Sequence, residues 1–356
     1  MPKIDALLTE MVNSGASDLH MVPGLPPMLR MRGDLTRTKH GPITHKSNEE
    51  LFFEMMAPEQ QKRLQTTLEL DMAYDVEGLA RFRCNYFYQV RGLSAVFRQI
   101  PTQIKSLDDL GMPDGVKSVL QVRRGLVLVT GPTGSGKSTT LAAIIDHINE
   151  TREQHVITIE DPLEFVHVNK KSLVTQREIG THARSFADAL RVASREDPDI
   201  ILVGEMRDLE TISLALTCAE LGILVFGTLH TNSAVKTIDR IINAFPAIQQ
   251  NQVRSMLSES IKAVLSQQLL KTADGAGRCV AVEILLSSPG VANLIREAKL
   301  AQIASVIQTG TTEGMQTMDQ ALQKLVDEGR ITAQAAYWKA IDKNLFVDQC
   351  GDSVFE

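Results

Sequence analysis

The segment Gly125-Leu-Val-Leu-Val-Thr130-Gly131-Pro-Thr-Gly-Ser-Gly136-Lys137-Ser138 decides the fold of this chain. It opens with an apolar run that has no polar side, and it continues into the pattern G-x-x-x-x-G-K-[ST] before a helix-like run, Thr139–Ile148. A strand, a glycine-rich loop and a helix in this order turn several backbone N–H groups toward one concavity, where they bind phosphate oxygens. The sequence therefore predicts a nucleotide-binding α/β domain.

The loop residues expected to bind phosphates follow from this pattern. The glycines allow the backbone to curl around an anion, Lys137 would reach the β- and γ-phosphates, and the Ser138 hydroxyl would ligate Mg²⁺. A glycine-rich turn that matches by chance is the alternative, and the flanking strand and helix argue against it. The predicted binding residues are Gly131, Thr133, Gly134, Ser135, Gly136, Lys137, Ser138 and Thr139.

Acidic residues end two further apolar runs. One run reads Ile157-Thr-Ile-Glu160-Asp161-Pro-Leu-Glu164, and the other reads Asp199-Ile-Ile-Leu-Val-Gly-Glu205. Because the carboxyl ends of parallel strands meet at one edge of a sheet, these acids are expected beside the phosphate loop. There one carboxylate would hold Mg²⁺ and another would activate water, and Glu164 and Glu205 are the candidates. The alternative is that the acids cap the helices that follow, and spacing alone does not assign the base.

The pattern of the 356 residues changes along the chain. Residues 1–100 contain short strand-like runs and predict an N-terminal α+β domain. Residues 101–117, with Pro101 and Pro113, predict a linker that serves as a hinge. Residues 118–290 predict the nucleotide-binding core, and residues 291–356 predict a helical C-terminal region.

Individual elements are predicted from apolar spacing. The core strands, which are expected to be parallel and covered by helices on both faces, are Gly125–Val129, His155–Ile159, Asp199–Val203 and Ile223–Thr228. The first domain is predicted to contain a helix around Ile4–Val12, a helix-to-strand turn at Ser17–His20, and the strands Met28–Met31, Met72–Val76, Arg81–Gln89 and Leu93–Gln99. Residues from Asn344 onward show no periodicity and predict a loose tail.

Composition excludes several classes of protein. With 43% hydrophobic and 22% charged residues, the chain is neither disordered nor fibrous, and its net charge of −6 argues against a broadly basic protein. No apolar run approaches the ~20 residues of a membrane span, and the first residues do not resemble a secretory signal, so we expect the chain in the cytosol. The four cysteines form no Cys-x-x-Cys pair, which gives a zinc site or a disulfide framework no support.

Together with Gly227-Thr-Leu-His230-Thr-Asn-Ser, these segments resemble the secretion and type IV pilus ATPase family. The branch that retracts type IV pili is the most similar one, and the lack of a Cys-x-x-Cys pair and of extra N-terminal domains also favours it. The family has a Walker A loop, an acidic box, a Walker B segment and a histidine box, which here are Gly131–Ser138, Ile157–Glu164, Asp197–Glu205 and Leu229–Ser233. Further similar segments are Ser17–His20, Phe165–His167, Gln176–Glu178 and Asn293–Glu297.

The resemblance implies a fold and a function. The expected fold is an N-terminal PAS-like domain, a RecA-like P-loop ATPase core and a C-terminal helical bundle. The expected function is a homo-hexamer that hydrolyses ATP with Mg²⁺ beside an inner-membrane pilus platform protein and withdraws pilin subunits from the fibre. By analogy, Glu164 would be the catalytic glutamate and Glu205 the Walker B carboxylate that holds Mg²⁺ directly or through water. Ile223 and Ala292 replace a histidine and an arginine of the family pattern, which leaves motor coupling open while hydrolysis is still expected.

Arginines of the first domain are candidates to act across a ring. Arg81 and Arg83 share one face of a predicted strand, and Arg98 lies on the neighbouring strand. A supplied arginine accelerates phosphoryl transfer by ~10³–10⁵, and the resemblance assigns this role to arginines that reach a neighbour's nucleotide. We therefore predict catalytic roles for Arg83 and Arg98, with Arg81 as a third candidate. A solvated strand face is the alternative.

His230 follows a predicted strand and is interpreted as a sensor of the γ-phosphate, with a hydrogen-bonded structural residue as the alternative. Other functions for the whole chain are an accessory retraction paralogue, a RecA-like nucleic-acid translocase and a scaffold that binds nucleotide without hydrolysis. Negative net charge and only 4% aromatic residues disfavour the translocase, so no nucleic acid is expected as a partner. Lys137, Ser138, Glu164 and Glu205 disfavour the scaffold.

Overall fold

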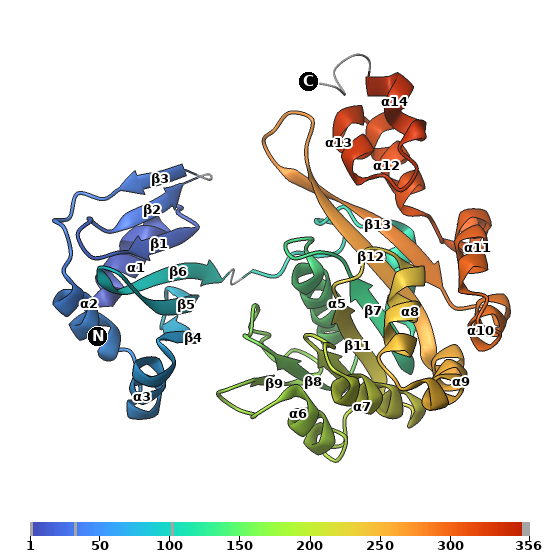
Figure 1. Cartoon of the computed structure of the whole chain (residues 1–356), viewed down its shortest axis with the longest axis horizontal. Coiled ribbons are helices and arrows are strands. Elements are labelled where there is room, and N and C mark those ends of the chain that lie inside the picture. Colours follow the sequence, from blue (N-terminus) through green and yellow to red (C-terminus); the bar gives the residue numbers. More distant parts are fainter. Residues whose placement is uncertain (1–2, 32–33, 101–102, 351–356) are drawn as a thin grey trace. The chain divides into compact units, whose positions relative to one another are not determined.

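The computed structural model describes residues 3–31, 34–100 and 103–350. The chain forms two units, one of residues 1–103 with 162–166 and the other of residues 104–161 with 167–356. Each unit has its own sheet flanked by helices (Figure 1). The predicted α/β class is confirmed, with an antiparallel first sheet and a mixed, mostly parallel second sheet. Within the described ranges, no helix is long and apolar enough to cross a membrane.

The first unit is an antiparallel sheet packed against helices. Alternation builds it: on β5, Phe82 and Tyr86 are fully buried, while Arg81 and Arg83 between and beside them reach the other face. The sheet order is β3-β2-β1-β6-β5-β4, with β1 Asp18–Met21, β2 Met28–Met31, β3 Asp34–Arg37, β4 Glu69–Val76, β5 Ala80–Gln89 and β6 Gly92–Ile100. The helices are α1 Ile4–Asn13, α2 His45–Phe53 and α3 Pro58–Thr67.

The second unit has a seven-stranded sheet in the order β13-β12-β7-β11-β10-β8-β9. All neighbours are parallel except β13, which runs antiparallel to β12. All six residues of β7 are buried, because Leu126 and Leu128 pack on one face of the sheet and Val127 and Val129 on the other. The strands are β7 Gly125–Thr130, β8 His155–Glu160, β9 Leu173–Glu178, β10 Ile200–Val203, β11 Leu224–Leu229, β12 Ile261–Lys271 and β13 Arg278–Leu286.

Helices cover both faces of this sheet. Apolar side chains of α5 pack on the face that contains Val127, and those of α6, α7, α8 and α9 pack on the face that contains Leu126. The helices are α4 Asp114–Lys117, α5 Lys137–Thr151, α6 Phe186–Ala193, α7 Leu209–Glu220, α8 Ala234–Asn243, α9 Gln250–Ser260, α10 Pro289–Arg296, α11 Ile303–Thr309, α12 Met318–Asp327, α13 Ala333–Lys339 and α14 Asn344–Cys350. Short 3₁₀ turns occur at Ser118–Gln121, Ala247–Gln249, Leu300–Gln302 and Gly310–Glu313.

The predicted strands are confirmed with small shifts of their ends, and two other predictions are wrong. Residues 344–350 are a helix rather than a loose tail, because Phe346 is fully buried beside Met318 and Leu322; residues 351–356 lie outside the described part. Ser17–His20 is not only a turn, since Asp18 begins strand β1.

Residues of the predicted linker pack within the second unit. Leu107, Met112 and Val116 are buried in the same apolar cluster as α5, and Asp114–Lys117 forms α4. Pro101 lies outside the described residues. The predicted boundaries 1–100, 101–117, 118–290 and 291–356 stay predictions.

Three rings at the centre of the first unit generate a stability prediction. Phe52, Tyr86 and Phe97 are fully buried and meet edge to face, with ring centroids 5.2 to 5.8 Å apart. Phe97→Ala should therefore lower the free energy of unfolding of this unit by about 3–5 kcal/mol. Faster hydrogen exchange of the β5 and β6 amides would measure the loss. Val90→Ala, at a fully exposed position in the turn after β5, is the matched control, and equal exchange in both variants would contradict the prediction.

Candidate active site

The phosphate loop joins β7 to α5 in a conformation that requires glycine. Gly131, Gly134 and Gly136 have φ angles of 143°, 78° and 90°, in the region that L side chains rarely adopt. A Cβ on Gly131 would also collide with the Gln267 carbonyl oxygen and the Ser135 hydroxyl. The backbone can therefore curl tightly around the N-terminus of α5.

Two polar side chains of the loop test whether it suits a phosphate. The Ser135 hydroxyl is buried and has no hydrogen-bond partner within the described residues. The Lys137 ammonium folds back on the loop and donates to the carbonyl oxygens of Gly131, at 2.8 Å, and Pro132, at 3.1 Å. An unpaired hydroxyl and a cation beside the N-terminus of a helix are groups that bind phosphate oxygens, so the loop suits a nucleotide. Ser138 and Thr139 are half-buried at the start of α5, and Thr133 and Gly134 are exposed.

The structure brings two predicted catalytic residues together. His230 Nε2 lies 3.0 Å from Glu205 Oε1, and the Arg207 guanidinium forms an ion pair with the same carboxylate oxygen. The Glu205 side chain is mostly buried, and its hydrogen bond raises the pKa of Arg207. Sequence reasoning missed Arg207, for which the signal was a cation two positions after the Walker B glutamate. His230 and Arg207 thus orient the Glu205 side chain, whose oxygens are ligands of the kind that Mg²⁺ takes.

A chain of hydroxyl groups links β7, the strand before the phosphate loop, to the histidine segment, Leu229–Ser233. Thr130 Oγ1, at the end of β7, lies 2.9 Å from Ser266 Oγ on β12 and 3.5 Å from Thr237 Oγ1 on α8. Thr237 Oγ1 lies 2.6 Å from Thr231 Oγ1, which follows His230 directly. Thr130, Thr237 and Ser266 are buried, so these polar groups satisfy one another away from water.

Glu164 belongs to the segment Pro162–Val166, which is part of the first unit. It is exposed in the segment between β8 and β9, and among the described residues no hydrogen bond or ion pair joins it to Glu205 or His230. Its role as the catalytic base stays a prediction.

The predicted arginines lie in one row across the first sheet. The row follows successive cross-strand partners: Arg30 on β2, Asp18 on β1, Arg98 on β6 and Arg83 on β5. Arg98 Nε donates to Asp18 Oδ1 at 2.7 Å, and Arg83 Nε lies 3.9 Å from an Asp71 oxygen. Arg83 and Arg98 remain 41% and 66% exposed, so both guanidinium groups reach solvent on this unit.

The side chains of Asp18 and Arg81 are more buried than those of Arg83 and Arg98. Burial opposes the charge of Asp18, but hydrogen bonds from the Ser17 hydroxyl and the Arg98 guanidinium prevail and lower the pKa of this carboxyl. Asp18 therefore anchors Arg98 as a charged partner. The Arg81 side chain is only 17% exposed and pairs with Asp75 at 2.7 Å, which makes it less available than Arg83.

Comparison with known proteins identifies close relatives. The type IV pilus retraction ATPase PilT of Pseudomonas aeruginosa is 55% identical over 337 residues, which cover 95% of this chain and 98% of that protein. A twitching motility protein of Neisseria gonorrhoeae is 55% identical over 314 residues, which cover 88% of this chain and 84% of that protein. A crystal structure of the pilus retraction motor PilT with bound ADP has a similar fold, with a TM-score of 0.90 and 46% identity over 96% of this chain and 98% of that chain.

The family model for type II/IV secretion system proteins matches residues 1–343. The resemblance inferred from the motifs is thus confirmed over nearly the whole chain. The chain belongs to the type II/IV secretion system protein family, among its type IV pilus retraction ATPases.

Proposed function

We propose that this ATPase converts hydrolysis of Mg²⁺-bound ATP into mechanical withdrawal of pilin subunits from the base of a pilus. The observation that supports this most directly is the contact of His230 with Glu205 at the sheet edge where the phosphate loop begins. His230 follows β11 and Glu205 follows the neighbouring strand β10. Because the two side chains are in contact, a change at the phosphates would shift both segments together. The relatives named for pilus retraction support the same function.

The residues of the loop and the two neighbouring strands divide the chemistry. Backbone amides of Gly134 and Gly136 and the Lys137 ammonium hold the phosphates, and Lys137 leaves its carbonyl partners to do so. Ser138 and Glu205 would hold Mg²⁺, which supplies charge neutralisation at the β- and γ-oxygens. Glu164 accepts the proton of the attacking water, and Thr133, Ser135 and Thr139 complete the cradle. His230 senses the γ-phosphate while it remains tied to Glu205.

The strand order supports a RecA-like core. β7 and β8 are consecutive in the chain, yet β11 and β10 lie between them, so the phosphate loop emerges near the middle of the sheet. The antiparallel first sheet, with α1 to α3, is the arrangement we propose as the PAS-like domain. The helices from α10 to α14 form the proposed C-terminal helical bundle.

We propose that the working form is a homo-hexamer in which first-domain arginines complete a neighbour's site. Arg83 and Arg98 are cross-strand partners of like charge, which destabilises a sheet, and they stay exposed. Such a pair is better explained by an anion supplied from outside the unit than by stability. The proposed location is the cytoplasmic side of the inner membrane, with the pilus platform protein as the direct partner and without nucleic acid.

Glu205→Ala tests the coupling of hydrolysis to movement. Loss of this carboxylate should lower ATP turnover about 100-fold or more, because charge at the transferred phosphate is no longer stabilised, while ATP affinity changes little. Phosphate release, fluorescent-nucleotide binding and pilus retraction in a strain deleted for its own retraction ATPase measure the three effects. Asp239→Ala on the exposed face of α8 is the control. Retraction that continues without hydrolysis would refute the proposal.

A mixing experiment tests whether the arginines act between subunits. Lys137→Ala and Arg83→Ala should each be inactive as pure proteins. In a random 1:1 assembly about one quarter of the sites combine an intact loop with an intact arginine from the neighbour, so partial ATP turnover should return. The same mixture made with Arg98→Ala should behave alike. Arg37→Ala, at an exposed position of β3, is the control and should be active as a pure protein. If mixing restores no ATP turnover, the arginines do not act on a neighbouring subunit's site.

A further inference from the structure

Glu283 on β13 is a buried carboxyl group outside the phosphate loop, with only 4% of the residue exposed. Its Oε1 atom accepts the Ala234 N–H at 2.6 Å, and the Met318 N–H is a second donor to the same group. Among the described residues, no lysine, arginine or histidine forms an ion pair with it. Burial raises the pKa of this carboxyl, and the two N–H groups oppose the rise. These two donors are thus the contacts that make the buried position acceptable for a carboxyl group.

Both donors are the first residues of helices. Ala234 begins α8 directly after Ser233, the last residue of the histidine segment, and Met318 begins α12 after Thr317. The Ser233 and Thr317 hydroxyls accept N–H groups of the third residues of their helices. The first N–H of each helix has no partner within the helix itself, and Glu283 accepts both. One side chain of β13 therefore joins the starts of two helices that lie far apart in the chain.

The histidine segment is attached to α8 by short hydrogen bonds. Thr231, the residue after His230, lies 2.6 Å from the Thr237 hydroxyl on α8, and Thr237 donates to the Ser233 carbonyl oxygen at 2.7 Å. Glu283 binds the first residue of the same helix. A displacement of His230 would therefore reach this carboxyl group through one turn of α8.

The start of α12 is attached to β13 on both sides of Glu283. Gln316 and Ile284 exchange two backbone hydrogen bonds, of 2.8 and 3.2 Å, and the Gln316 side chain donates to the Val282 carbonyl at 2.8 Å. Glu283 lies between Val282 and Ile284 and binds α12 itself. It is therefore the position at which α8 joins the attachment of α12 to the sheet.

Away from Glu283, the two helices pack separately. Apolar side chains of α8, such as Ile238, belong to one buried cluster, and those of α12, such as Leu322, belong to another. A cavity of about 980 Å³ lies beside the two helix starts, with Ser233, Glu283 and Thr317 among its lining residues. This open space leaves room for either helix start to shift, so the polar contact at Glu283 is the link that would transmit such a shift.

We propose that Glu283 is a positioning residue that couples the histidine segment to the C-terminal helices. When the loss of the γ-phosphate shifts His230, the start of α8 moves with it, and the carboxyl group of Glu283 carries the displacement to the start of α12. The proposal rests on the sensor role proposed above for His230. It adds the residue through which α12 responds to the nucleotide.

Glu283→Met tests this role, because methionine keeps the length of the side chain and removes both acceptor oxygens. Hydrogen exchange of α8 and α12 amides is measured in the full-length protein with ADP and with a non-hydrolysable ATP analogue. In the parent, the exchange rates of α12 with the two nucleotides should differ about 5-fold or more, the usual size of coupling between sites. In Glu283→Met the rates of α12 should agree within about twofold, while α8 keeps its difference. A residue with a structural role alone would change α12 exchange equally with both nucleotides.

Asp319→Asn is a control on α12 itself. The Asp319 carboxylate accepts the N–H groups of Ile341, at 2.8 Å, and Asp342, at 3.0 Å, and so attaches α12 to the segment before α14. It makes a contact of the same kind as Glu283 without binding α8. The variant should keep the difference of the parent at α12.

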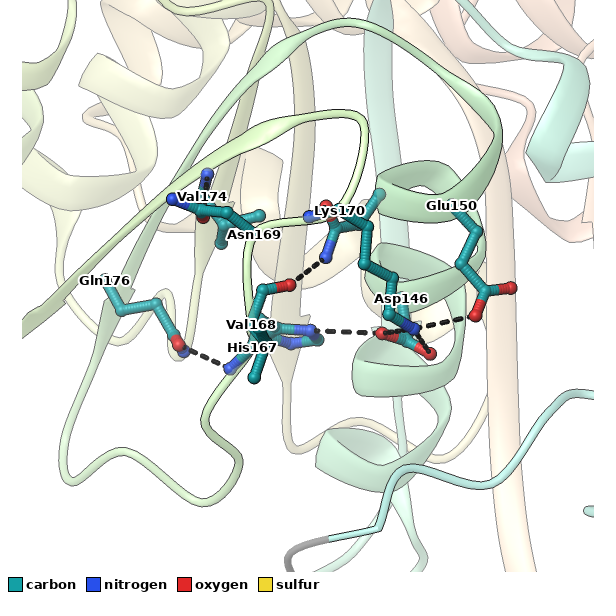
Figure 2. A network of polar contacts seen from close by, with 9 residues as sticks. Asp146, Glu150, His167, Val168, Asn169, Lys170, Val174 and Gln176 are labelled. Atoms are coloured by element: carbon teal, nitrogen blue, oxygen red, sulfur yellow. Dashed lines mark hydrogen bonds and ion pairs between the residues drawn. The ribbon is translucent and has the colours of Figure 1, made fainter.

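Lys170→Met is a second control, in a polar network elsewhere in the same unit. Figure 2 shows the Lys170 ammonium between two acids of α5, 2.9 Å from both carboxylate oxygens of Asp146 and 2.7 Å from Glu150 Oε1. The backbone of the same segment, Val168–Lys171, is bonded to Asn149 of α5. Because this network does not include the histidine segment, the variant should keep the differences at α8 and α12.

The two proposals fail in different ways. If α12 shows no difference between the nucleotides in the parent, or the same difference in Glu283→Met, the coupling role of Glu283 is wrong. If His230→Ala keeps the difference at α8, the sensor role of His230 is wrong, and the coupling role falls with it. Thermal unfolding reports whether Glu283→Met folds. Glu283→Asp, which is one methylene too short to reach both helices, replaces it if it does not.

Discussion

The nucleotide site depends on the register between β7 and β11. Thr130 is the partner of Leu229, and the Gly131 N–H donates to the Leu229 carbonyl at 3.3 Å. The phosphate loop and the histidine segment therefore leave the sheet at the same level. A slip by one residue would exchange the two faces of β7, and both faces are buried against different helices, so packing specifies the register strongly.

The same constraint passes from strand to strand along the sheet. Val203 on β10 is the partner of Gly227 on β11. Glu205, two residues after Val203, and His230, three residues after Gly227, therefore leave the sheet at nearly the same level. Their 3.0 Å contact follows from that geometry rather than from closeness in sequence. Because buried hydroxyls of Thr130 and Thr237 fill the space behind, the histidine segment is also held from the side of the phosphate loop.

Helix α5 has a second organising role. Its apolar face, with Ile144, Ile145 and Ile148, packs on the sheet, which fixes its axis relative to β7. Its N-terminus faces the phosphate loop, and about two to three turns later its polar face holds the Lys170 segment. One helix therefore contacts both the phosphate loop and the segment Val168–Lys171.

The parts of this fold that the sequence predicts are those with local signals. The loop Gly131–Ser138 and the apolar strands were recognised because glycine spacing and unalternated hydrophobic runs are properties of neighbouring residues. Strand β12 was missed because Ser266 and Gln267 interrupt its apolar run. Both are buried, and their partners, Thr130 and Thr140, are more than a hundred positions away. Such a polar group is tolerated only through a contact that the fold creates.

The same limit applies to the site and to α3. The acids and His230 were found by their positions after strands, but the pairing of Glu205 with His230 and Arg207 needs the sheet order, which local patterns do not contain. Helix α3 was missed because Leu64 is its only buried residue, so no apolar stripe marks it.

The arginine row shows how stability and function can be distinguished within one sheet. On stability alone, a strand pair gains from opposite charges, yet Arg83 and Arg98 are direct partners. Arg98 lies 2.7 Å from Asp18, while Arg83 is held less closely, at 3.9 Å from Asp71. The buried Asp18 carboxylate pairs with the Nε atom of Arg98, and most of the Arg98 side chain stays exposed. The guanidinium groups of Arg98 and Arg83, which lie side by side, can therefore still bind an anion with several oxygens. The phosphate group of another subunit's nucleotide, which we propose as the partner of these arginines, is an anion with several oxygens of this kind.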